Sequence, residues 1–265
     1  MRSMHKNFRK LALGLAAVLW LAGTASAAEI RVMISGGLSA AYNALVGEFE
    51  RTTGHKVLTA YGPSMGTTQN AIPVRLERGE GADVLILVGY ALGELIKQGK
   101  VVPDSRVDLV RSKIGVAVKA GAVKPDISSA DALKRTLLAA RSVAYSDSAS
   151  GVYVSTEMFQ KLGIADEMKD RAKKIPATPV AEIVARGEAE IGFQQISELK
   201  PVAGIDILGP LPDELQKVTV FSAGIASVSK EPDAGRALIG FLASAAARDV
   251  IVNSGLEPIN AGGTN

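Results

Sequence analysis

The sequence has 265 residues and a net charge of +3, from 30 basic and 27 acidic side chains, but four of the basic and none of the acidic ones lie within the first 27 residues. The rest of the chain therefore carries 26 basic and 27 acidic residues, and a balance so close to neutral excludes the basic surface of a nucleic-acid-binding protein. Cysteine is absent, which excludes a disulfide-stabilised fold, thiolate metal ligands, a cysteine nucleophile and a lipid anchor on cysteine.

Residues 1–27 have the pattern of a secretory signal peptide. Basic residues precede an apolar stretch, Leu11 to Ala22, and Ala25-Ser26-Ala27 supplies the small side chains that signal peptidase requires. The apolar stretch is too short to span a membrane, which favours this interpretation over a single N-terminal membrane anchor. We therefore expect export to the periplasm and a mature chain that begins at Ala28.

Strands and helices are predicted to alternate along the first part of the mature chain. Tyr42, Leu45 and Phe49 recur with helical periodicity, and Gly54 follows as a helix stop. Pro73 suits the first turn of a later helix. The predicted elements are strands at 29–34, 56–61 and 82–88 and helices at 39–54, 74–79 and 91–99.

A second alternation follows from residue 114 onward. Its predicted strands are 114–121, 142–146, 190–194 and 218–228, and its predicted helices are 131–140, 153–163, 179–188, 233–244 and 245–255. Strands that alternate with helices are typical of α/β proteins with parallel sheets. We expect two such lobes, with the end of the chain returning to the first lobe.

Four loops that follow strands share small, polar and uncharged residues. In open parallel sheets the loops at the carboxyl ends of strands bind ligands, and the helix N-termini that begin there attract anions. Ordinary N-capping of the helices explains any single loop equally well. The candidate anion-binding residues in these loops are Ser35, Gly36, Gly37, Ser64, Met65, Gly66, Thr67, Ser146, Ser148, Ser150, Gly151, Gln194 and Gln195.

Nucleotide binding and histidine catalysis have no support in the sequence. The segment Ser35-Gly36-Gly37 does not match a dinucleotide-binding fingerprint, and no phosphate-binding Walker sequence is present. His55 is the only histidine after the signal peptide, and its place between a helix and a strand indicates a surface loop.

Segments along nearly the whole mature chain resemble class II periplasmic solute-binding proteins, in particular the molybdate-binding group. The segments are VMISGGLSAAYNALVGEFERTTGHKV, the Ser64 loop, GEGADVLILV, SVAYSDSASGVYVSTEMFQKLGI, GEAEIGFQQISEL and FLASAAARDVIVNSGL. The resemblance implies two α/β lobes joined by two hinge crossovers, with the ligand in the cleft between them. Lobe 1 would comprise residues 28–111 and 222–265, and lobe 2 would comprise residues 112–221.

Three departures from the molybdate-binding pattern bear on the ligand. Gly37 stands where molybdate binders usually have a serine, and Gln195 stands where they commonly have a tyrosine. The Ser64 loop is also longer, which suits a larger ligand and brings Asn70 and Arg75 towards the cleft. Arginine can hold a carboxylate through two parallel hydrogen bonds, although a solvated helix charge is an equally good interpretation of Arg75.

The combination of YGPSMGTT, YSDSASGVY and IGFQQISEL resembles a divergent branch of the family, which includes periplasmic aconitate isomerases, more than it resembles molybdate binders. The resemblance implies an allylic proton shift between trans- and cis-aconitate in the cleft, without a metal or other cofactor. The alternative is the substrate-binding component of an ABC transporter, which would deliver a small organic polyanion or a molybdate-like oxyanion to its permease. Under either hypothesis we expect a monomer that binds a small polyanion.

The proton shift needs a side chain that removes a carbon-bound proton and returns it. Ser64 and Asp147 are the candidate catalytic residues, because both stand in loops of the predicted cleft. Asp147 could equally brace its loop. Tyr61 and Tyr145 end strands beside the site, where half-buried packing is the more common role of a tyrosine.

Overall fold

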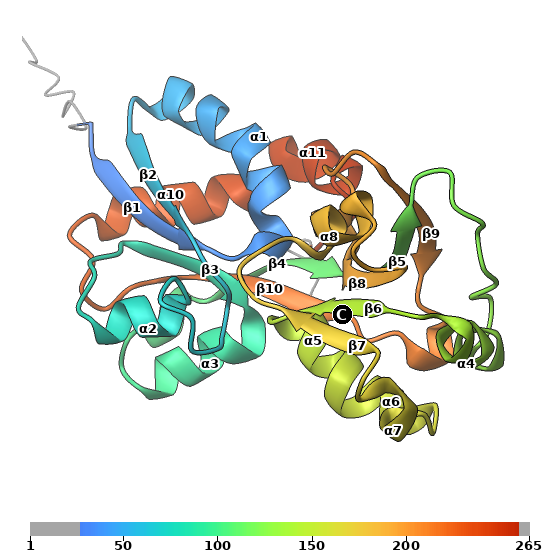
Figure 1. The fold of residues 1–265 in the computed structure, drawn as a ribbon. Helices are drawn as coiled ribbons and strands as arrows, with labels where there is room; N and C mark the ends of the chain where they lie inside the picture. The colour runs from blue at the N-terminus through green and yellow to red at the C-terminus, as the bar shows by residue number, and fades with distance from the viewer. Residues whose placement is uncertain (1–26, 260–265) are drawn as a thin grey trace, which may run out of the picture.

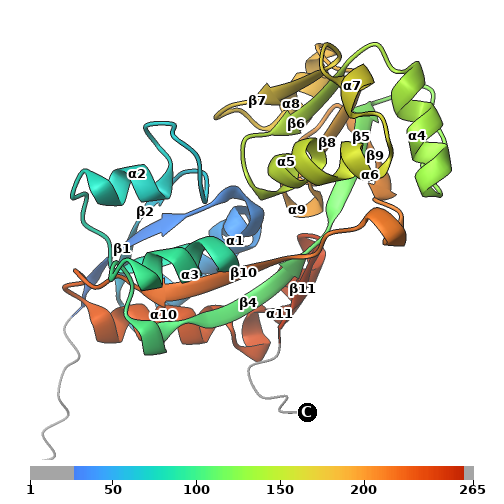
Figure 2. The same cartoon turned by 90° about the horizontal axis from the view of Figure 1, so that it is seen from below.

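The computed structural model describes residues 27–259, so the predicted signal peptide lies, apart from Ala27, outside the described residues. Figures 1 and 2 show two α/β lobes, each built around its own sheet. Two segments of chain connect the lobes, one after β4 and the other before β10. In the described part of the chain no helix is both long and apolar enough to cross a membrane.

Lobe 1 is built around a six-stranded sheet with the order β11-β4-β10-β3-β1-β2. Its strands are β1 (Glu29–Ile34), β2 (Lys56–Tyr61), β3 (Val84–Val88), β4 (Val107–Ser112), β10 (Thr219–Ile225) and β11 (Leu256–Pro258). Its α-helices are α1 (Gly36–Thr53), α2 (Ile72–Glu77), α3 (Gly89–Lys97), α10 (Pro232–Leu242) and α11 (Arg248–Asn253), with 3-10 turns at Pro103–Ser105 and Ala245–Ala247.

Lobe 2 is built around a five-stranded sheet with the order β7-β6-β8-β5-β9. Its strands are β5 (Ile114–Lys119), β6 (Val143–Ser146), β7 (Ala172–Ile175), β8 (Ile191–Gln195) and β9 (Ile205–Pro210). Its α-helices are α4 (Ala130–Ala139), α5 (Ala149–Tyr153), α6 (Phe159–Lys161), α7 (Ala165–Met168), α8 (Val180–Arg186) and α9 (Ile196–Leu199). A π-helical turn (Val154–Met158) links α5 to α6, and a 3-10 turn covers Asp213–Leu215.

Each sheet is covered by helices on both faces. In lobe 1 the apolar stripe of α1, with Tyr42, Leu45 and Phe49, joins α10 and α11 in one core, while α2 and α3 cover the opposite face. In lobe 2 the α4 and α5–α7 segments cover one face and α8 and α9 the other. Strand β3 is buried along its whole length, as expected of an apolar strand between two helical layers.

The prediction of parallel sheets is correct for only part of each lobe. Strand β1 is parallel to β2 and β3, and β6 is parallel to β7 and β8. Strand β10 is antiparallel to β3 and β4, and β5 is antiparallel to β8 and β9. The antiparallel pairs involve strands beside the two lobe crossings, where the chain enters or leaves a sheet in the reverse direction.

The chain passes from one sheet to the other between Ser112 and Ile114, and it re-enters the first sheet at Thr219. The predicted lobe boundaries, after residue 111 and at residue 222, stay predictions. The strand order of the two sheets brings the loops that follow β1, β2, β6 and β8 together where the lobes meet.

Candidate functional site

A cavity of about 230 Å³ lies between the two lobes. Its walls come from the start of α1, the loop after β2, the β6–α5 turn, the loop before α8, and the segment from the end of β8 into α9. These are loops at the carboxyl ends of strands, which is where open α/β sheets bind ligands. The lining residues are Gly36, Ser39, Tyr61, Gly62, Pro63, Asn70, Ser146, Asp147, Ser148, Ala177, Thr178, Pro179, Gln194 and Glu198.

The N-terminus of α1 packs directly against lobe 2. Ser197 donates a hydrogen bond of 2.6 Å to the carbonyl of Gly37. A side chain at Gly36 would collide with the Glu198 carboxyl, and one at Gly37 would collide with the Phe221 ring. Gly37 therefore allows α1 to pack closely on β10 within lobe 1, and Gly36 leaves room for the Glu198 carboxyl of lobe 2. The hydroxyl of Ser35, which precedes α1, is buried and has no hydrogen-bond partner within residues 27–259.

Glu198 presents a carboxyl group to this cavity from the one-turn helix α9. The Gln194 side chain and the Gln195 N–H both hydrogen-bond to it. Gln194 is oriented by its own Oε1, which accepts the N–H of Val180 at 2.9 Å, so its amide NH₂ is left to face the carboxyl. Burial raises the pKa of Glu198 to about 7, the two hydrogen bonds oppose this, and the charge of Asp147 adds to it.

The β6–α5 turn is held by the hydroxyl of Ser146. This oxygen lies 2.9 Å from the hydroxyl of Ser150 and accepts the N–H of Gly151 at 3.3 Å and that of Ser148 at 3.4 Å. A side chain at Gly151 would collide with the backbone of Ser146, so glycine is required there. The hydroxyls of Ser146 and Ser150 thus shape the turn, and this leaves Asp147 and Ser148 in the cavity wall.

Asp147 also braces the loop before α8. Its Oδ2 accepts the N–H of Ala177 at 3.3 Å, and Ala177 has a φ of 56°, in the left-handed region that an alanine rarely adopts. Ala177 lines the cavity together with Asp147. A strained backbone held by a neighbouring side chain is typical of functional loops.

The Ser64 loop reaches from lobe 1 to the β6–α5 turn of lobe 2. Ser64 itself is fully buried, and its Oγ accepts the N–H of Val88 at 3.1 Å, at the start of α3. Gly66 has a φ of 97°, and a Cβ there would lie 4.0 Å from the carbonyl oxygen of Asp147. Met65 accepts a long hydrogen bond, 3.5 Å, from the Tyr90 hydroxyl. The loop closes over the lobe junction, and of its predicted site residues Asn70 lines the cavity.

Arg75 is paired within lobe 1. Its Nε donates to Glu80 Oε2 at 2.9 Å, its Nη2 binds the other oxygen of the same carboxylate, and its Nη1 donates to the carbonyl of Tyr61 at 3.3 Å. These bonds raise the pKa of Arg75 and lower that of Glu80. The bidentate arginine–carboxylate geometry predicted for a ligand is here made with the protein's own Glu80.

The structure thus brings together six of the sequence-predicted site residues in one cavity wall: Gly36, Asn70, Ser146, Asp147, Ser148 and Gln194. The other predicted residues do not line the cavity: Ser35, Gly37, Ser64, Met65, Gly66, Thr67, Arg75, Ser150, Gly151 and Gln195. Gln195 is buried, and its Nε2 donates to Thr219 at 3.1 Å, while its Oε1 has no partner in the described chain.

Sequence reasoning missed Glu198, Ser39 and the 177–179 loop. Glu198 was not predicted as a site residue, because an acid three residues after a strand is typically an exposed charge on a short helix. No sequence signal identifies it: only the structure shows that Ser197 and Leu199, on either side of it, are both buried.

The charges of the cavity wall are unusual for an anion site. Its lining includes the carboxyls of Asp147 and Glu198 and no lysine or arginine. Favourable interactions with an anion must therefore come from the positive end of α1 and from neutral donors. Among the described residues no three His, Cys, Asp or Glu side chains are grouped to bind a metal ion.

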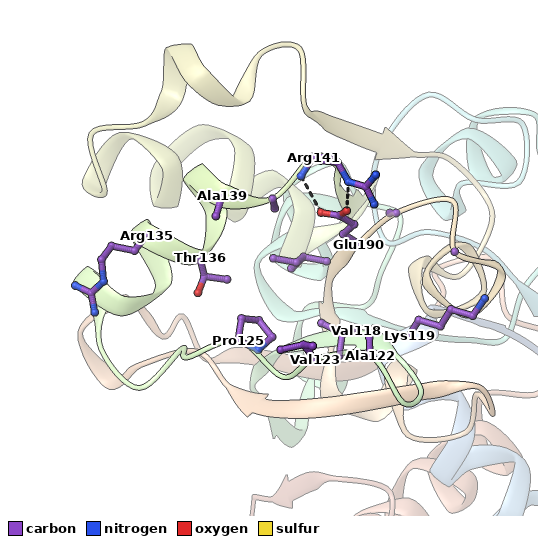
Figure 3. Close-up of a pocket in the computed structure, with 14 residues that line it drawn as sticks. Val118, Lys119, Ala122, Val123, Pro125, Arg135, Thr136, Ala139, Arg141 and Glu190 are labelled. Carbon is purple, nitrogen blue, oxygen red and sulfur yellow. Dashed lines mark hydrogen bonds and ion pairs between the residues drawn. The ribbon is translucent and has the colours of Figure 1, made fainter.

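Two larger cavities lie elsewhere. One of about 560 Å³ also touches both lobes, but its cations are paired, Arg106 with Asp108 and Lys217 with Glu157. The other, of about 760 Å³, lies within lobe 2 beside α4 and the end of β5. Figure 3 shows it bordered by apolar side chains, with Arg141 turned to Glu190 at one side. None of the four predicted anion-binding loops contributes to its walls, and its size alone does not make it the candidate site.

Comparisons with known proteins agree with this architecture. Residues 30–257 match the family model described as bacterial extracellular solute-binding protein. An aconitate isomerase of a Pseudomonas species is 50% identical over 232 residues, which cover 88% of each chain. The molybdate-binding protein of Azotobacter vinelandii is 27% identical over 259 residues, 94% of this chain and 97% of that protein.

Solved structures show the same fold at lower identity. The periplasmic molybdate-binding protein of Azotobacter vinelandii superposes with a TM-score of 0.67 at 21% identity, over 86% of this chain and 98% of the other. The sulfate-binding protein of Mycobacterium tuberculosis gives 0.68 at 17% identity, over 88% of both chains. The chain belongs to the family of bacterial extracellular solute-binding proteins.

Proposed function

We propose that this protein is an aconitate isomerase that interconverts trans- and cis-aconitate in the interlobe cavity. The observation that carries the proposal is the 50% identity to an aconitate isomerase over 88% of both chains, against 27% to a molybdate-binding protein. The replacement of two positions typical of molybdate binders, at Gly37 and Gln195, points the same way.

The reaction is an allylic proton shift, and the carboxyls of Asp147 and Glu198 in the cavity wall support it as the site of that shift. A base takes a proton from the methylene carbon, and the electrons of that C–H bond form a new double bond to the central carbon. The electrons of the former double bond then take a proton at the far carbon, so no atom or electron is gained or lost. A closed interlobe cavity excludes water from this transfer.

Neutral donors are proposed to hold the substrate carboxylates. Gly36 opens α1, whose N-terminal N–H groups carry partial positive charge, and Asn70, Ser148 and Gln194 line the same space. Asp147 remains a catalytic candidate because it lines the cavity, whereas Ser64 acts through the loop that it fixes to Val88. The residues around the wall are proposed to shape the site.

Arg75 provides a separate test of carboxylate recognition. If the cleft closes so that Arg75 exchanges Glu80 for a substrate carboxylate, Arg75→Ala will weaken binding of trans-aconitate by about tenfold or more and spare binding of molybdate. Isothermal titration with both anions measures this. Equal effects on the two anions would leave Arg75 as a structural partner of Glu80.

The family places the protein outside the cytoplasm, and the predicted signal peptide makes the periplasm the proposed compartment. A second function has support from the family match: the substrate-binding component of an ABC transporter for a small polyanion. The protein would then bind its ligand as a monomer and transfer it to a permease without changing it.

The two functions differ in whether product appears. Protein purified from the periplasm is mixed separately with trans-aconitate and with cis-aconitate, and proton NMR follows the vinyl and methylene signals. An isomerase brings both samples to the same final ratio within many turnovers. A folded protein that binds either isomer and leaves both unchanged supports the transporter component instead.

A further inference from the structure

We infer that Glu198 is the catalytic group that moves the proton in this cavity, and that Gln194 is the residue that positions its carboxyl. The inference rests on the proposed isomerase function and deepens it.

Glu198 is located where the two lobes meet. Glu198 lies in the wall of the interlobe cavity, and its Oε1 lies against Gly36 at the start of α1. The adjacent Ser197 bonds to Gly37, so α9 is fixed to the other lobe at this point. A carboxyl held at the junction of the lobes meets the substrate whenever the lobes enclose it.

The Glu198 carboxyl is oriented by its neighbours Gln194 and Gln195. Gln194 cannot rotate its amide freely, because its Oε1 accepts the Val180 N–H while its NH₂ bonds to Glu198. The N–H of Gln195 supplies a second donor to the same carboxyl. Two donors beside the carboxyl favour one orientation of it, which suits a catalytic base.

The surroundings of Glu198 also set its charge state. Burial raises the pKa of Glu198 to about 7, so both protonation states are populated at neutral pH. Asp147 from the β6–α5 turn raises the pKa further through its charge, while the positive N-terminal end of α1, at Gly36, opposes the rise. Tyr61 and Ser39 line the same cavity. A base of this kind can take a proton and give it back with little cost in either direction.

The step is balanced with Glu198 as the single carrier. Its carboxylate takes the methylene proton, the C–H electron pair becomes part of the new double bond, and the resulting carboxylic acid protonates the far carbon of the former double bond. Glu198 returns to its ionised state, and no other reactant is consumed. The competing role for Glu198 is structural, as a contact between α9 and α1.

Glu198→Gln separates the two roles, because glutamine keeps the size of the side chain and one acceptor oxygen but cannot take up a proton. We expect kcat to fall by about 100- to 10,000-fold, while the Kd for trans-aconitate changes by less than about fivefold. Glu182→Gln is the matched control, since Glu182 is an exposed acid on α8 of the same lobe, and within residues 27–259 its carboxylate pairs with Arg186. It should behave as the wild type.

Gln194→Leu tests the positioning role through the pH profile. The Gln194 bond lowers the pKa of Glu198, so its loss should move the midpoint of the rise of kcat/KM with pH upward from about 7. A structural role alone would lower kcat/KM equally at all pH values. Glu198→Asp, which keeps a carboxyl one methylene shorter, should retain a measurable rate with the same pH-dependent rise.

Three results would overturn the inference. A Glu198→Gln variant that keeps more than a tenth of the wild-type kcat would show that another group moves the proton. A folded Glu198→Gln variant that no longer binds trans-aconitate, together with a Glu198→Asp variant without pH dependence, would leave only a structural role. A wild-type protein that fails to isomerise aconitate would refute the proposed function itself, and the inference with it.

Discussion

Replacing Glu198 by glutamine should make the stability of the protein less sensitive to pH. The ordinary pKa of this carboxyl is 4.5, and burial in the interlobe cavity raises it to about 7. The difference corresponds to at most about 3 kcal/mol of unfolding free energy, and to less where water enters the cavity. Glutamine resembles the protonated acid, so the variant lacks this dependence.

The direction of the effect follows from the raised pKa. The stabilising contribution of protonated Glu198 is complete below about pH 4.5, where the unfolded chain also binds the proton. It is lost as the pH rises through about 7, because the folded protein must then ionise a carboxyl that is poorly solvated. The stability of Glu198→Gln relative to wild type should therefore increase by up to about 3 kcal/mol between pH 4.5 and pH 8.5.

Urea denaturation at four pH values over this interval measures the difference directly. Contributions of other titrating groups cancel when the variant is compared with the wild type at each pH. Glu182→Gln serves as the control and should give a nearly constant difference. If the curves for Glu198→Gln and wild type run parallel from pH 4.5 to 8.5, Glu198 does not carry a raised pKa and the electrostatic part of the reasoning is wrong.

Three further predictions concern other parts of the fold. Gly151→Ala should lower the melting temperature by several degrees, because the new methyl group collides with the backbone of Ser146; an unchanged melting curve would mean that the turn can open at no cost. Asp83→Asn should cost about 1–3 kcal/mol at pH 7 in a urea titration. Burial alone would raise the pKa of Asp83, but four hydrogen bonds outweigh burial and lower this pKa. The wild type should therefore lose the same stability as the pH falls through the pKa of Asp83. An Asp83→Asn variant as stable as the wild type at pH 7 would contradict this prediction. Ser64→Ala should weaken aconitate binding by freeing the loop that the Val88 N–H holds, and an unchanged Kd by calorimetry would exclude the loop from the site.

Much of the fold could be predicted from local patterns in the sequence. The periodicity of Tyr42, Leu45 and Phe49 gave the helix that is observed, and Gly54 ends it in the left-handed conformation with a φ of 77°. The all-apolar run of β3 gave a buried strand. The edge strands β7, β9 and β11 and the inner strand β4 were not predicted, because their alternation is weak and their pairing depends on distant partners.

The candidate site could be predicted only where it consists of loops after strands. Asp147 and Gln194 were placed in it by that rule, and both line the cavity. Glu198 could not be placed in the site from the sequence, because its surroundings include α1. The hydrogen bond from Ser197 to Gly37 shows that α1 packs there although it lies about 160 residues earlier in the chain. Arg75 shows what local sequence does reveal, since its partner Glu80 stands only five residues away in the chain.

Proton NMR of the wild-type protein with trans-aconitate in heavy water tests most directly whether the protein isomerises aconitate. We expect cis-aconitate to accumulate over many turnovers, with deuterium entering the methylene group to the extent that the proton on Glu198 exchanges with solvent. Unchanged trans-aconitate in the presence of folded, aconitate-binding protein would contradict it and leave a binding protein whose cavity performs no chemistry.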